Sequence, residues 1–286
     1  MNLGRVAIVG LGLIGGSIAK TIRERGLGAS LLGIDQEPVL AAARTLLDAS
    51  AVPGSDEARE LLREADLVVL AAPPRIILET LPSTLDACRP DAVVTDTASV
   101  KLALRQRALA HPRGSRFVPG HPMAGREIGG FEASRADLFE EKSWFLVEAG
   151  PDAAALERVG DFVRALGAVP SFVSAEEHDF AMGLVSHLPH LVASALLELA
   201  AQADVLDFAG PGFKDTTRIA GGPDAIWADI FAQNRANLVA SLDALVRRLD
   251  GIKVALASGE REGVEAALAL LAMARRAKAA PGSRDC

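Results

Sequence analysis

An apolar segment near the N-terminus runs directly into a cluster of glycines. Residues 6–9 are all apolar, Gly10, Gly12 and Gly15 follow in the spacing Gly-x-Gly-x-x-Gly, and helix-forming residues continue to position 25. In a strand–turn–helix unit the first glycine permits a tight turn, the second lets the backbone approach a pyrophosphate, and the third lets the helix pack close to the strand. The pattern therefore predicts a dinucleotide-binding unit with the phosphates at the helix N-terminus.

An acidic residue, Asp35, ends the next apolar run at residues 31–34. A carboxylate at this place accepts a hydrogen bond from the ribose 2′-OH and repels the additional 2′-phosphate of NADP, so the sequence favours NAD. The alternative is a strand–turn–helix unit whose glycines are incidental. We expect the cofactor to be held by Gly10, Gly12, Leu13, Ile14, Gly15, Asp35 and Ser99.

Short apolar runs alternate with longer helix-compatible segments through the first half of the chain. The runs lie at residues 6–9, 31–34, 67–71, 92–95, 116–119 and 144–147, with a further one at 169–173. Such alternation is typical of an α/β fold with a doubly wound parallel sheet covered by helices on both faces. We therefore predict a Rossmann-like dinucleotide-binding domain over residues 1–173.

The pattern changes after Ser174. Two acidic residues, Glu176 and Glu177, follow it as in the first turn of a helix, and strand signals nearly vanish from there on. The helical segments that follow carry more apolar positions than a solvent-exposed surface needs. We predict an all-α domain over residues 174–286 whose apolar excess is buried within that half or against a second subunit.

Composition limits the classes of function. The 286 residues are 50% hydrophobic, which is enough to bury a sizeable core, and the net charge of −7 argues against a nucleic-acid binder. Only Cys88 and Cys286 are present, which excludes a disulfide framework and a cysteine metal site. No run of about 20 uninterrupted apolar residues is available to span a membrane. We expect a cytoplasmic protein with no metal, nucleic-acid or membrane partner.

Two segments that follow predicted strands carry candidate catalytic side chains. His121 lies between glycine and proline in residues 119–125, where a turn would present it to a ligand, and a neutral imidazole can accept a proton from an alcohol during hydride removal. Ser99 follows the run at 92–95, at the sheet edge where α/β folds bind ligands. A structural histidine and a helix-capping serine are the alternatives.

The helical half adds two histidines and an arginine. His187 and His190 lie three positions apart in a stretch that is otherwise apolar, and hydrogen bonding, subunit contact and substrate contact all stay open for them. A metal site would need at least a third ligand. Arg218 follows Asp215 in a polar segment, and its guanidinium suits bidentate binding of a carboxylate, although a solvated surface cation is the default.

Taken in order, these motifs resemble the prephenate dehydrogenase family, which includes the arogenate and cyclohexadienyl dehydrogenases. The likeness covers residues 5–240 and rests on the glycine turn, Gly-His-Pro-Met-Ala-Gly at 120–125, Ser-His-Leu-Pro-His at 186–190 and Asp-Thr-Thr-Arg-Ile-Ala at 215–220. The resemblance implies a Rossmann-like domain followed by a helical domain that forms a homodimer, and a small-molecule substrate, prephenate or arogenate.

The resemblance also implies a reaction, the NAD-dependent oxidative decarboxylation of prephenate to 4-hydroxyphenylpyruvate in tyrosine biosynthesis. It gives His121 the role of assisting removal of the C4 hydroxyl proton and gives Ser99 the role of orienting that hydroxyl. Arg218 would bind a substrate carboxylate, with Asp215 beside it, and His187 or His190 would line the same site.

Other functions stay open at this point. One alternative is an arogenate dehydrogenase, or a cyclohexadienyl dehydrogenase that accepts both prephenate and arogenate. A β-hydroxyacid dehydrogenase combines the same two kinds of domain but commonly relies on a lysine in the helical half. A non-catalytic NAD-binding sensor would keep the glycine turn and lose the histidine or the arginine, whereas this chain has both His121 and Arg218.

Overall fold

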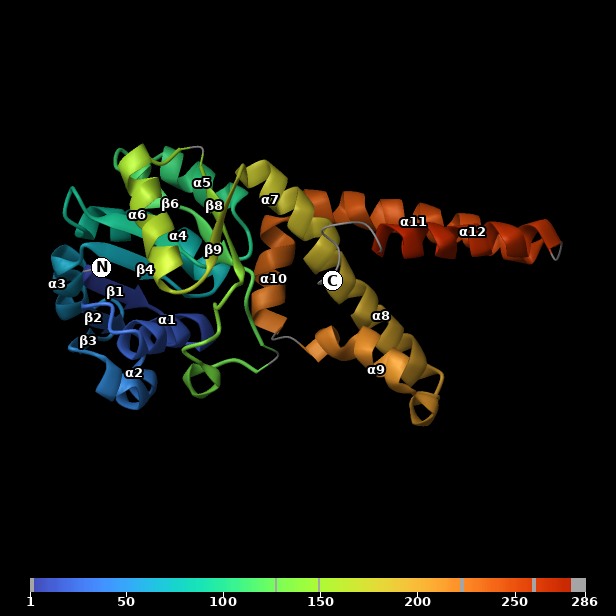
Figure 1. Ribbon diagram of the computed structural model, residues 1–286, viewed down its shortest axis with the longest axis horizontal. Helices are drawn as coiled ribbons and strands as arrows, with labels where there is room; N and C mark the ends of the chain where they lie inside the picture. The colour runs from blue at the N-terminus through green and yellow to red at the C-terminus, as the bar shows by residue number, and fades with distance from the viewer. Residues whose placement is uncertain (1–2, 127, 149, 222–223, 259–260, 279–286) are drawn as a thin grey trace. The chain divides into compact units, whose positions relative to one another are not determined.

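The computed structural model describes residues 3–126, 128–148, 150–221, 224–258 and 261–278 (Figure 1). Contacts between residues divide the chain into two compact units, Met1–Arg235 and Ala236–Cys286. This division differs from the boundary at 173/174 expected from the sequence, because the contacts group the helices that directly follow the last strand with the α/β part. The last eight residues, with Cys286 among them, lie outside the described residues.

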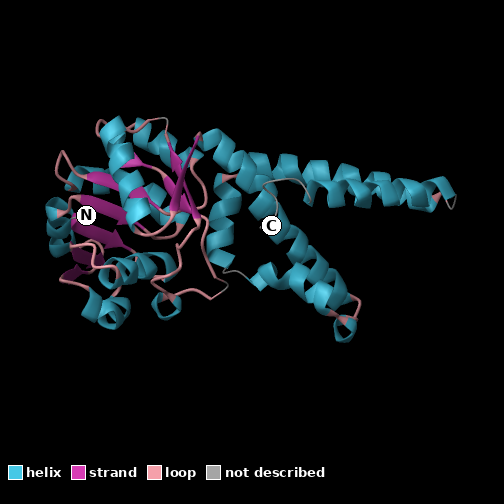
Figure 2. Cartoon of the chain, viewed as in Figure 1, coloured by secondary structure: helices cyan, strands magenta, loops and turns pink. Residues whose placement is uncertain are grey.

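A six-stranded parallel sheet forms the centre of the first unit, in the order β3-β2-β1-β4-β5-β6. Strands are drawn in magenta in Figure 2. The strands of this sheet are β1 (Gly4–Val9), β2 (Ala29–Ile34), β3 (Ala49–Ala51), β4 (Leu67–Leu70), β5 (Val93–Asp96) and β6 (Phe117–Val118). The helices between and after them are α1 (Leu13–Glu24), α2 (Glu37–Ala43), α3 (Asp56–Glu64), α4 (Pro74–Ala87), α5 (Leu102–Leu109) and α6 (Ala153–Ala165). Short 3₁₀ turns lie at Arg44–Leu46, Gly114–Arg116 and Phe131–Ala133.

Both faces of this sheet are buried under helices, as the continuous apolar runs predict. Side chains alternate across a strand, so Val6 and Ile8 of β1 pack into one core with α1 and α6, while Ala7 packs into the other with α4 and α5. The doubly wound parallel sheet is therefore confirmed for the first five predicted runs. β3 was not predicted, because three residues are too few for a recognisable pattern.

A second, smaller sheet corrects part of the prediction. It contains β7 (Gly120–Pro122), β8 (Ser143–Val147) and β9 (Val169–Val173) in the order β7-β8-β9, with β7 antiparallel to β8 and β8 parallel to β9. The runs at 144–147 and 169–173 are thus strands, but the expectation that they extend the parallel sheet was wrong. The expectation that His121 lies on a turn was also wrong, since it is the central residue of β7.

A bent helical run follows β9. It consists of α7 (Ala175–Met182), a π-helical turn at Gly183–His187 and α8 (Leu188–Gln202). Ser174 begins it with a complete capping box, because its hydroxyl accepts from the backbone of Glu177 and the Glu177 carboxylate accepts from the backbone of Ser174. The first unit ends with a 3₁₀ turn at Leu206–Phe208, α9 (Pro211–Thr217), a 3₁₀ turn at Arg218–Gly221 and α10 (Asp224–Gln233).

Among the described residues, the helical run Ala175–Gln202 is long and apolar enough to cross a membrane by length and composition alone. A core helix of a soluble protein passes the same test, and a third of its most apolar window is buried inside the fold. The buried polar side chains of Asp179 and His187 in this run find hydrogen-bond partners within the protein. The expected absence of a membrane partner stays a prediction.

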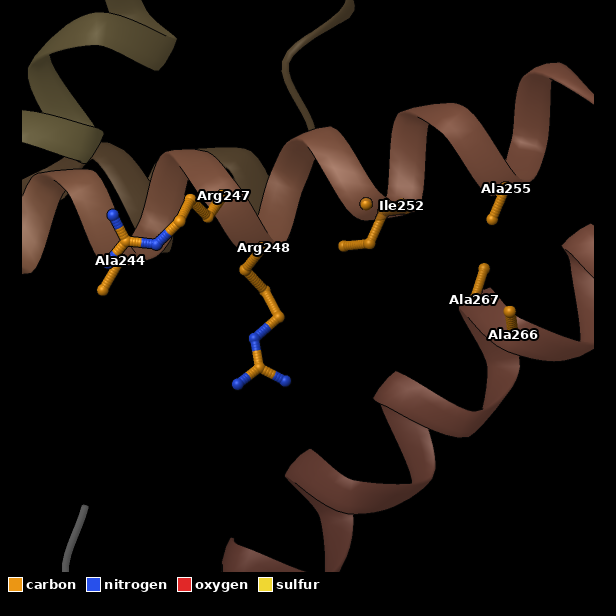
Figure 3. A pocket seen from close by; sticks show the side chains of 8 residues that line it. Ala244, Arg247, Arg248, Ile252, Ala255, Ala266 and Ala267 are labelled. Carbon is orange, nitrogen blue, oxygen red and sulfur yellow. The ribbon is translucent and has the colours of Figure 1, made fainter.

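Within its described residues, the second unit contains the helices α11 (Arg235–Ala257, of which Arg235 belongs to the first unit) and α12 (Arg261–Lys278). The helices approach closely near Gly263, where an added Cβ would lie 1.8 Å from the carbonyl oxygen of Ala255. Between them is an open groove of about 510 Å³, lined by the side chains of Arg247, Arg248 and Ile252 and by small alanines of both helices (Figure 3).

Candidate active site

The glycine turn between β1 and α1 has the geometry that a dinucleotide requires. Gly10 has a φ of 93°, and an added Cβ would lie 2.5 Å from the carbonyl oxygen of Ala71. At Gly15 a Cβ would lie 1.9 Å from the carbonyl oxygen of Gly10, so only glycine lets α1 approach the turn this closely. Gly12 precedes the first residues of α1, Leu13 and Ile14, and a Cβ there would meet open space. The space before the helix N-terminus fits a pyrophosphate.

Asp35 lies directly after β2 and is fixed beside this turn. One carboxylate oxygen accepts from the backbone N–H of Leu11 at 2.5 Å and the other from that of Gln36 at 2.6 Å. A carboxylate has about four acceptor positions, so both oxygens keep capacity for the hydroxyls of a ribose. Together with the glycines, Asp35 fits NAD.

A buried ion pair lies at the carboxyl end of β5. Lys101 and Asp96 are both fully buried, with Lys101 Nζ 2.5 Å from Asp96 Oδ2. Lys101 Nζ also donates to the carbonyl oxygen of Gly120 at 2.6 Å, and the N–H of Gly120 donates to Asp96 Oδ1 at 3.0 Å. Asp96 Oδ2 further accepts from the N–H of Ala98 at 2.9 Å. The pair therefore joins the end of β5 to the first residue of β7.

His121, the next residue of β7, begins a chain of hydrogen-bonded side chains. Its Nδ1 lies 2.9 Å from Nε2 of His178 on α7, and Nδ1 of His178 lies 2.8 Å from Oδ1 of Asp179. The Asp179 carboxylate also accepts from the backbone N–H groups of Lys101 at 2.8 Å and Leu102 at 2.9 Å, at the start of α5. His178 and Asp179 are buried, with exposures of 2% and 1%.

The order of these partners fixes which ring nitrogens carry protons. A carboxylate only accepts, so the proton of neutral His178 lies on Nδ1, facing Asp179. Nε2 of His178 is then an acceptor, and His121 must donate to it from Nδ1. Nε2 of His121 therefore carries a lone pair that no hydrogen bond within the described residues uses. This is the tautomer that a general base needs, and the second imidazole, that of His178, fixes it.

The surroundings of His121 also keep it uncharged. Burial lowers its pKa well below 6.5, and the positive charges that His178, Lys101 and His187 can carry lower it further. Burial likewise lowers the pKa of His178, although the hydrogen bond to Asp179 opposes that effect. At neutral pH both rings are accordingly neutral, as the chain of hydrogen bonds requires.

The histidines of the helical run lie in the same region. His187 ends the π-helical turn, is fully buried, and contacts the side-chain amide of Asn234 through Nδ1 at 3.1 Å. The same amide donates to the carbonyl oxygen of Asp179 at 2.7 Å, which connects His187 to the chain described above. Burial lowers the pKa of His187 to about 4, and its buried Nε2 has no hydrogen-bond partner within the described part of the fold.

His190 points to α10 instead. Its ring stacks on Trp227, with ring centroids 3.6 Å apart and planes 13° apart. Its Nδ1 is buried without a hydrogen-bond partner among the described residues, so both helical histidines keep a polar atom for which these residues supply no partner. A Leu-Pro pair, with Pro189 near the start of α8, separates the two histidines.

The remaining predicted residues lie outside this cluster. Ser99 is partly buried in the segment between β5 and α5, and no hydrogen bond within the described residues joins it to His121. Asp215 and Arg218 are exposed, on α9 and on the following 3₁₀ turn, and that turn packs against α8. Within the described residues, no group of three or more His, Cys, Asp or Glu side chains is arranged to hold a metal ion.

Sequence reasoning did not single out His178, Asp179 or Asn234. Glu176 and Glu177, directly before His178, indicated only the start of a helix, which they form. A signal was nevertheless present, because an adjacent His-Asp pair in the first turns of an apolar helix places two titratable groups where burial is expected. Their partner His121 is 57 positions away, so the pairing itself is visible only in the fold.

The chain matches the family model for the nucleotide-binding domain of prephenate dehydrogenase over residues 18–171. It matches the model for the dimerization domain of prephenate dehydrogenase over residues 174–270. The chain belongs to the prephenate dehydrogenase family. It is thus an oxidoreductase of the group that contains the prephenate, cyclohexadienyl and arogenate dehydrogenases, as the sequence motifs predict.

The matches to relatives in this family cover nearly the whole chain. The cyclohexadienyl dehydrogenase of Zymomonas mobilis is 31% identical, and the match covers 88% of each protein. The structure of a prephenate dehydrogenase from Aquifex aeolicus in complex with hydroxyphenyl propionate and NAD+ is 32% identical with a TM-score of 0.85, over 96% of this chain and 98% of that one. Arogenate dehydrogenase of Synechocystis is 28% identical with a TM-score of 0.76, over 95% and 99%.

Proposed function

We propose that this member of the prephenate dehydrogenase family uses NAD to convert prephenate to 4-hydroxyphenylpyruvate and carbon dioxide, as a step of tyrosine biosynthesis. His121 accepts the proton of the C4 hydroxyl in this reaction. The observation that carries the proposal is the chain Asp179–His178–His121, because its hydrogen bonds leave Nε2 of a neutral His121 as the acceptor. A base of this kind typically contributes about 10²- to 10⁴-fold to the rate.

The protein's own residues contribute proton transfer and orientation. NAD, when bound, supplies the hydride acceptor. His121 Nε2 takes the proton of the C4 hydroxyl while a hydride leaves C4 itself, so that C4 becomes a carbonyl carbon. The ring carboxylate then departs as carbon dioxide, the electrons of the broken C–C bond enter the ring, and the oxygen at C4 regains a proton as the phenol forms. His178 keeps the His121 ring oriented and correctly protonated throughout.

Asp35 supports NAD over NADP. Its carboxylate is held at the end of β2 by the N–H of Leu11, next to the glycine turn where the adenosine ribose would lie. The nucleotide-binding family model and the NAD+ complex of the Aquifex aeolicus relative support the same cofactor. Gly10, Gly12, Leu13, Ile14 and Gly15 would hold the pyrophosphate, and Ser99 would lie near the nicotinamide and the hydroxyl.

For the substrate we propose that Arg218 binds a carboxylate, with Asp215 orienting the guanidinium. The support is chemical: Arg218 offers a planar fork of donors, and the turn that carries it packs against α8, the helix of His190. His187 and His190 each have a buried nitrogen for which the described residues supply no hydrogen-bond partner, so these two residues are the candidates for contact with the rest of the substrate.

A homodimer through the helical part belongs to the proposal. The family model over residues 174–270 is that of a dimerization domain, which supports it. Large apolar side chains that are exposed in the single chain occur on α8, α11 and α12, and they include Leu199, Val246, Leu249, Leu268 and Leu271. Sedimentation equilibrium of the purified protein tests this part, with a monomer as the contradicting result. We also propose a cytoplasmic location, which fits Cys88 being a buried free thiol.

The decisive experiment follows NADH formation by absorbance with prephenate and with arogenate in parallel, each with NAD and with NADP. We expect NAD-dependent turnover of prephenate. Turnover of arogenate alone, or of both substrates, would identify an arogenate or a cyclohexadienyl dehydrogenase instead. If NAD binds and neither substrate reacts, the protein is a cofactor-binding sensor or acts on another hydroxy acid.

A further inference from the structure

Lys101 is a fully buried cation whose backbone and side chain contact different parts of the site. It precedes α5, and its backbone N–H donates to the carboxylate of Asp179, the residue that orients His178. Its side-chain ammonium reaches the carbonyl oxygen of Gly120, the residue directly before His121. Lys101 therefore contacts Asp179, which orients His178, and Gly120, which precedes His121 in β7. The rings of these two histidines are joined by the 2.9 Å contact between His121 Nδ1 and His178 Nε2.

The ion pair binds both backbone polar groups of Gly120. Lys101 Nζ binds its carbonyl oxygen at 2.6 Å, and Asp96, the ion-pair partner of Lys101, accepts from its N–H at 3.0 Å. An added Cβ at Gly120 would lie 2.8 Å from the carbonyl oxygen of Asp96, so the backbone is in close contact with the end of β5. β7 has three residues and lies at the edge of its sheet, with β8 as its neighbouring strand. The ion pair therefore supplies the anchoring that a central strand would obtain from a second neighbouring strand.

We propose that Lys101 is the positioning residue that keeps His121 and His178 in hydrogen-bonding register. Its ammonium is fully buried and bound to Asp96 and Gly120, so it acts through the two histidines and has no contact with solvent through which a ligand could reach it. The inference deepens the proposed function and rests on it, since the geometry it maintains is that of the proposed base.

Charge gives Lys101 a second effect on the same group. The groups that face His121 are His178 and His187 of the helical run and Lys101 at the start of α5, and after burial these are what lower its pKa. Asp96 and Asp179 are the facing carboxylates, and their charges raise the pKa of His178. Removal of the ammonium should therefore raise the pKa of His121 as well as loosen its position.

The test variant replaces the whole ion pair, Lys101→Met together with Asp96→Asn, so that no unpaired charge is left buried. The matched control neutralises an exposed pair of the same kind, Arg5→Met with Glu64→Gln. Lys101→Gln alone is the second variant, and it serves if the double variant does not fold. Its neutral amide removes the ammonium, and because burial raises the pKa of Asp96, that carboxyl can take up a proton once the cation is gone. Circular dichroism and thermal melting establish folding in each case.

The first readout needs no substrate. In protein labelled with ¹⁵N-histidine, the ring signals of His121 are assigned by their loss in His121→Asn and titrated with acid. We expect wild-type and control His121 to be protonated on Nδ1 and to titrate well below 6.5, whereas the Lys101 variants should show mixed tautomers and titration closer to 6.5. An unchanged tautomer and titration in a folded Lys101 variant would overturn the proposal.

The second readout is turnover. We expect kcat to fall by about 10²-fold in the double variant, because misplacement of a reacting group by about 1 Å has effects of that size, and the acid limb of the pH profile should move to higher pH. KM should change little. Wild-type kcat in a folded double variant would contradict the positioning role. If the wild-type protein is inactive with both substrates while the NMR changes appear, the proposed function fails and the role of Lys101 stands.

Discussion

The rings of His121 and His178 meet through Nδ1 and Nε2 at 2.9 Å, with their planes 75° apart. The hydrogen bond between them transmits the orientation set by Asp179 to the ring that faces the proposed reaction. A serine protease uses a carboxylate on its catalytic histidine directly. Here a second imidazole lies between them, so that the base is in the strand β7 while the carboxylate is on the helix α7.

Replacing the proposed base gives the simplest test. His121→Asn should keep NAD affinity and thermal stability but lower kcat by about 10²- to 10⁴-fold, the usual contribution of a general base. The measurement is NADH formation with each substrate, together with a fluorescence titration of NADH binding. His111, which lies beyond the C-terminal end of α5 and bonds to Asp86, offers the control His111→Asn. Unchanged turnover in His121→Asn would remove this residue from the mechanism.

Asp179→Asn tests the tautomer argument without removing any ring. An amide has one acceptor oxygen where the carboxylate has two, and three donors now face it, the N–H groups of Lys101 and Leu102 and Nδ1 of His178. Where the NH2 group of the amide faces Nδ1 of His178 it donates, which reverses the protonation of both imidazoles and blocks Nε2 of His121 with a proton. Loss of the correct tautomer costs about 10⁴-fold in a serine protease, and we expect kcat to fall at least about 10²-fold here. Glu176→Gln, on the same helix but in an exposed ion pair with Arg105, is the matched control. Equal activity of the two variants would argue against the relay.

The pH profile follows from the lowered pKa of the partly buried His121. A histidine whose pKa is lowered stays neutral until the pH falls through that lowered value, so activity is present above it and lost below it. We expect kcat/KM to be flat near neutrality, with its acid limb well below pH 6.5. A limb at or above pH 6.5 would mean that the pKa of His121 is not lowered in the working enzyme or that His121 is not the base.

Arg218→Gln separates binding from chemistry. Removal of a charge-assisted hydrogen bond to a carboxylate should raise KM by about 10- to 10²-fold and leave kcat within about twofold. The exposed Arg63 of α3 provides a control of the same chemistry, Arg63→Gln. An unaltered KM in Arg218→Gln would show that another group holds the carboxylate.

The glycine turn offers a pair of substitutions with opposite expectations for the fold. A Cβ at Gly12 meets open space and its φ of −67° suits alanine, so Gly12→Ala should melt at the wild-type temperature but bind NADH more weakly. At Gly15 the added atom would lie 1.9 Å from the carbonyl oxygen of Gly10, so Gly15→Ala should lower the melting temperature. Wild-type NADH affinity in Gly12→Ala would place the pyrophosphate elsewhere.

Local features of this protein were predictable from the sequence, and features that depend on packing were not. The glycine turn, the five parallel runs and the helix start at Ser174 are each set by a few adjacent residues. β7 has only three residues, and its first residue, Gly120, is bound by the buried pair Asp96–Lys101. Burial of a lysine runs against the usual preference. His121 was correctly singled out, but the strand that carries it and its partner His178 depend on contacts between distant segments.

The hydrogen bond between Asp35 and the N–H of Leu11 bears on how cofactor preference could evolve or be engineered. A change to NADP requires loss of the negative charge at position 35, yet the same carboxylate ties the end of β2 to the glycine turn at 2.5 Å. A substitution that gains affinity for a 2′-phosphate thus also loosens the loop that binds every dinucleotide. Specificity and general affinity are linked at this position, and a successful switch needs an uncharged acceptor that keeps the bond to Leu11, as Asp35→Asn or Asp35→Ser would provide, beside any new cation.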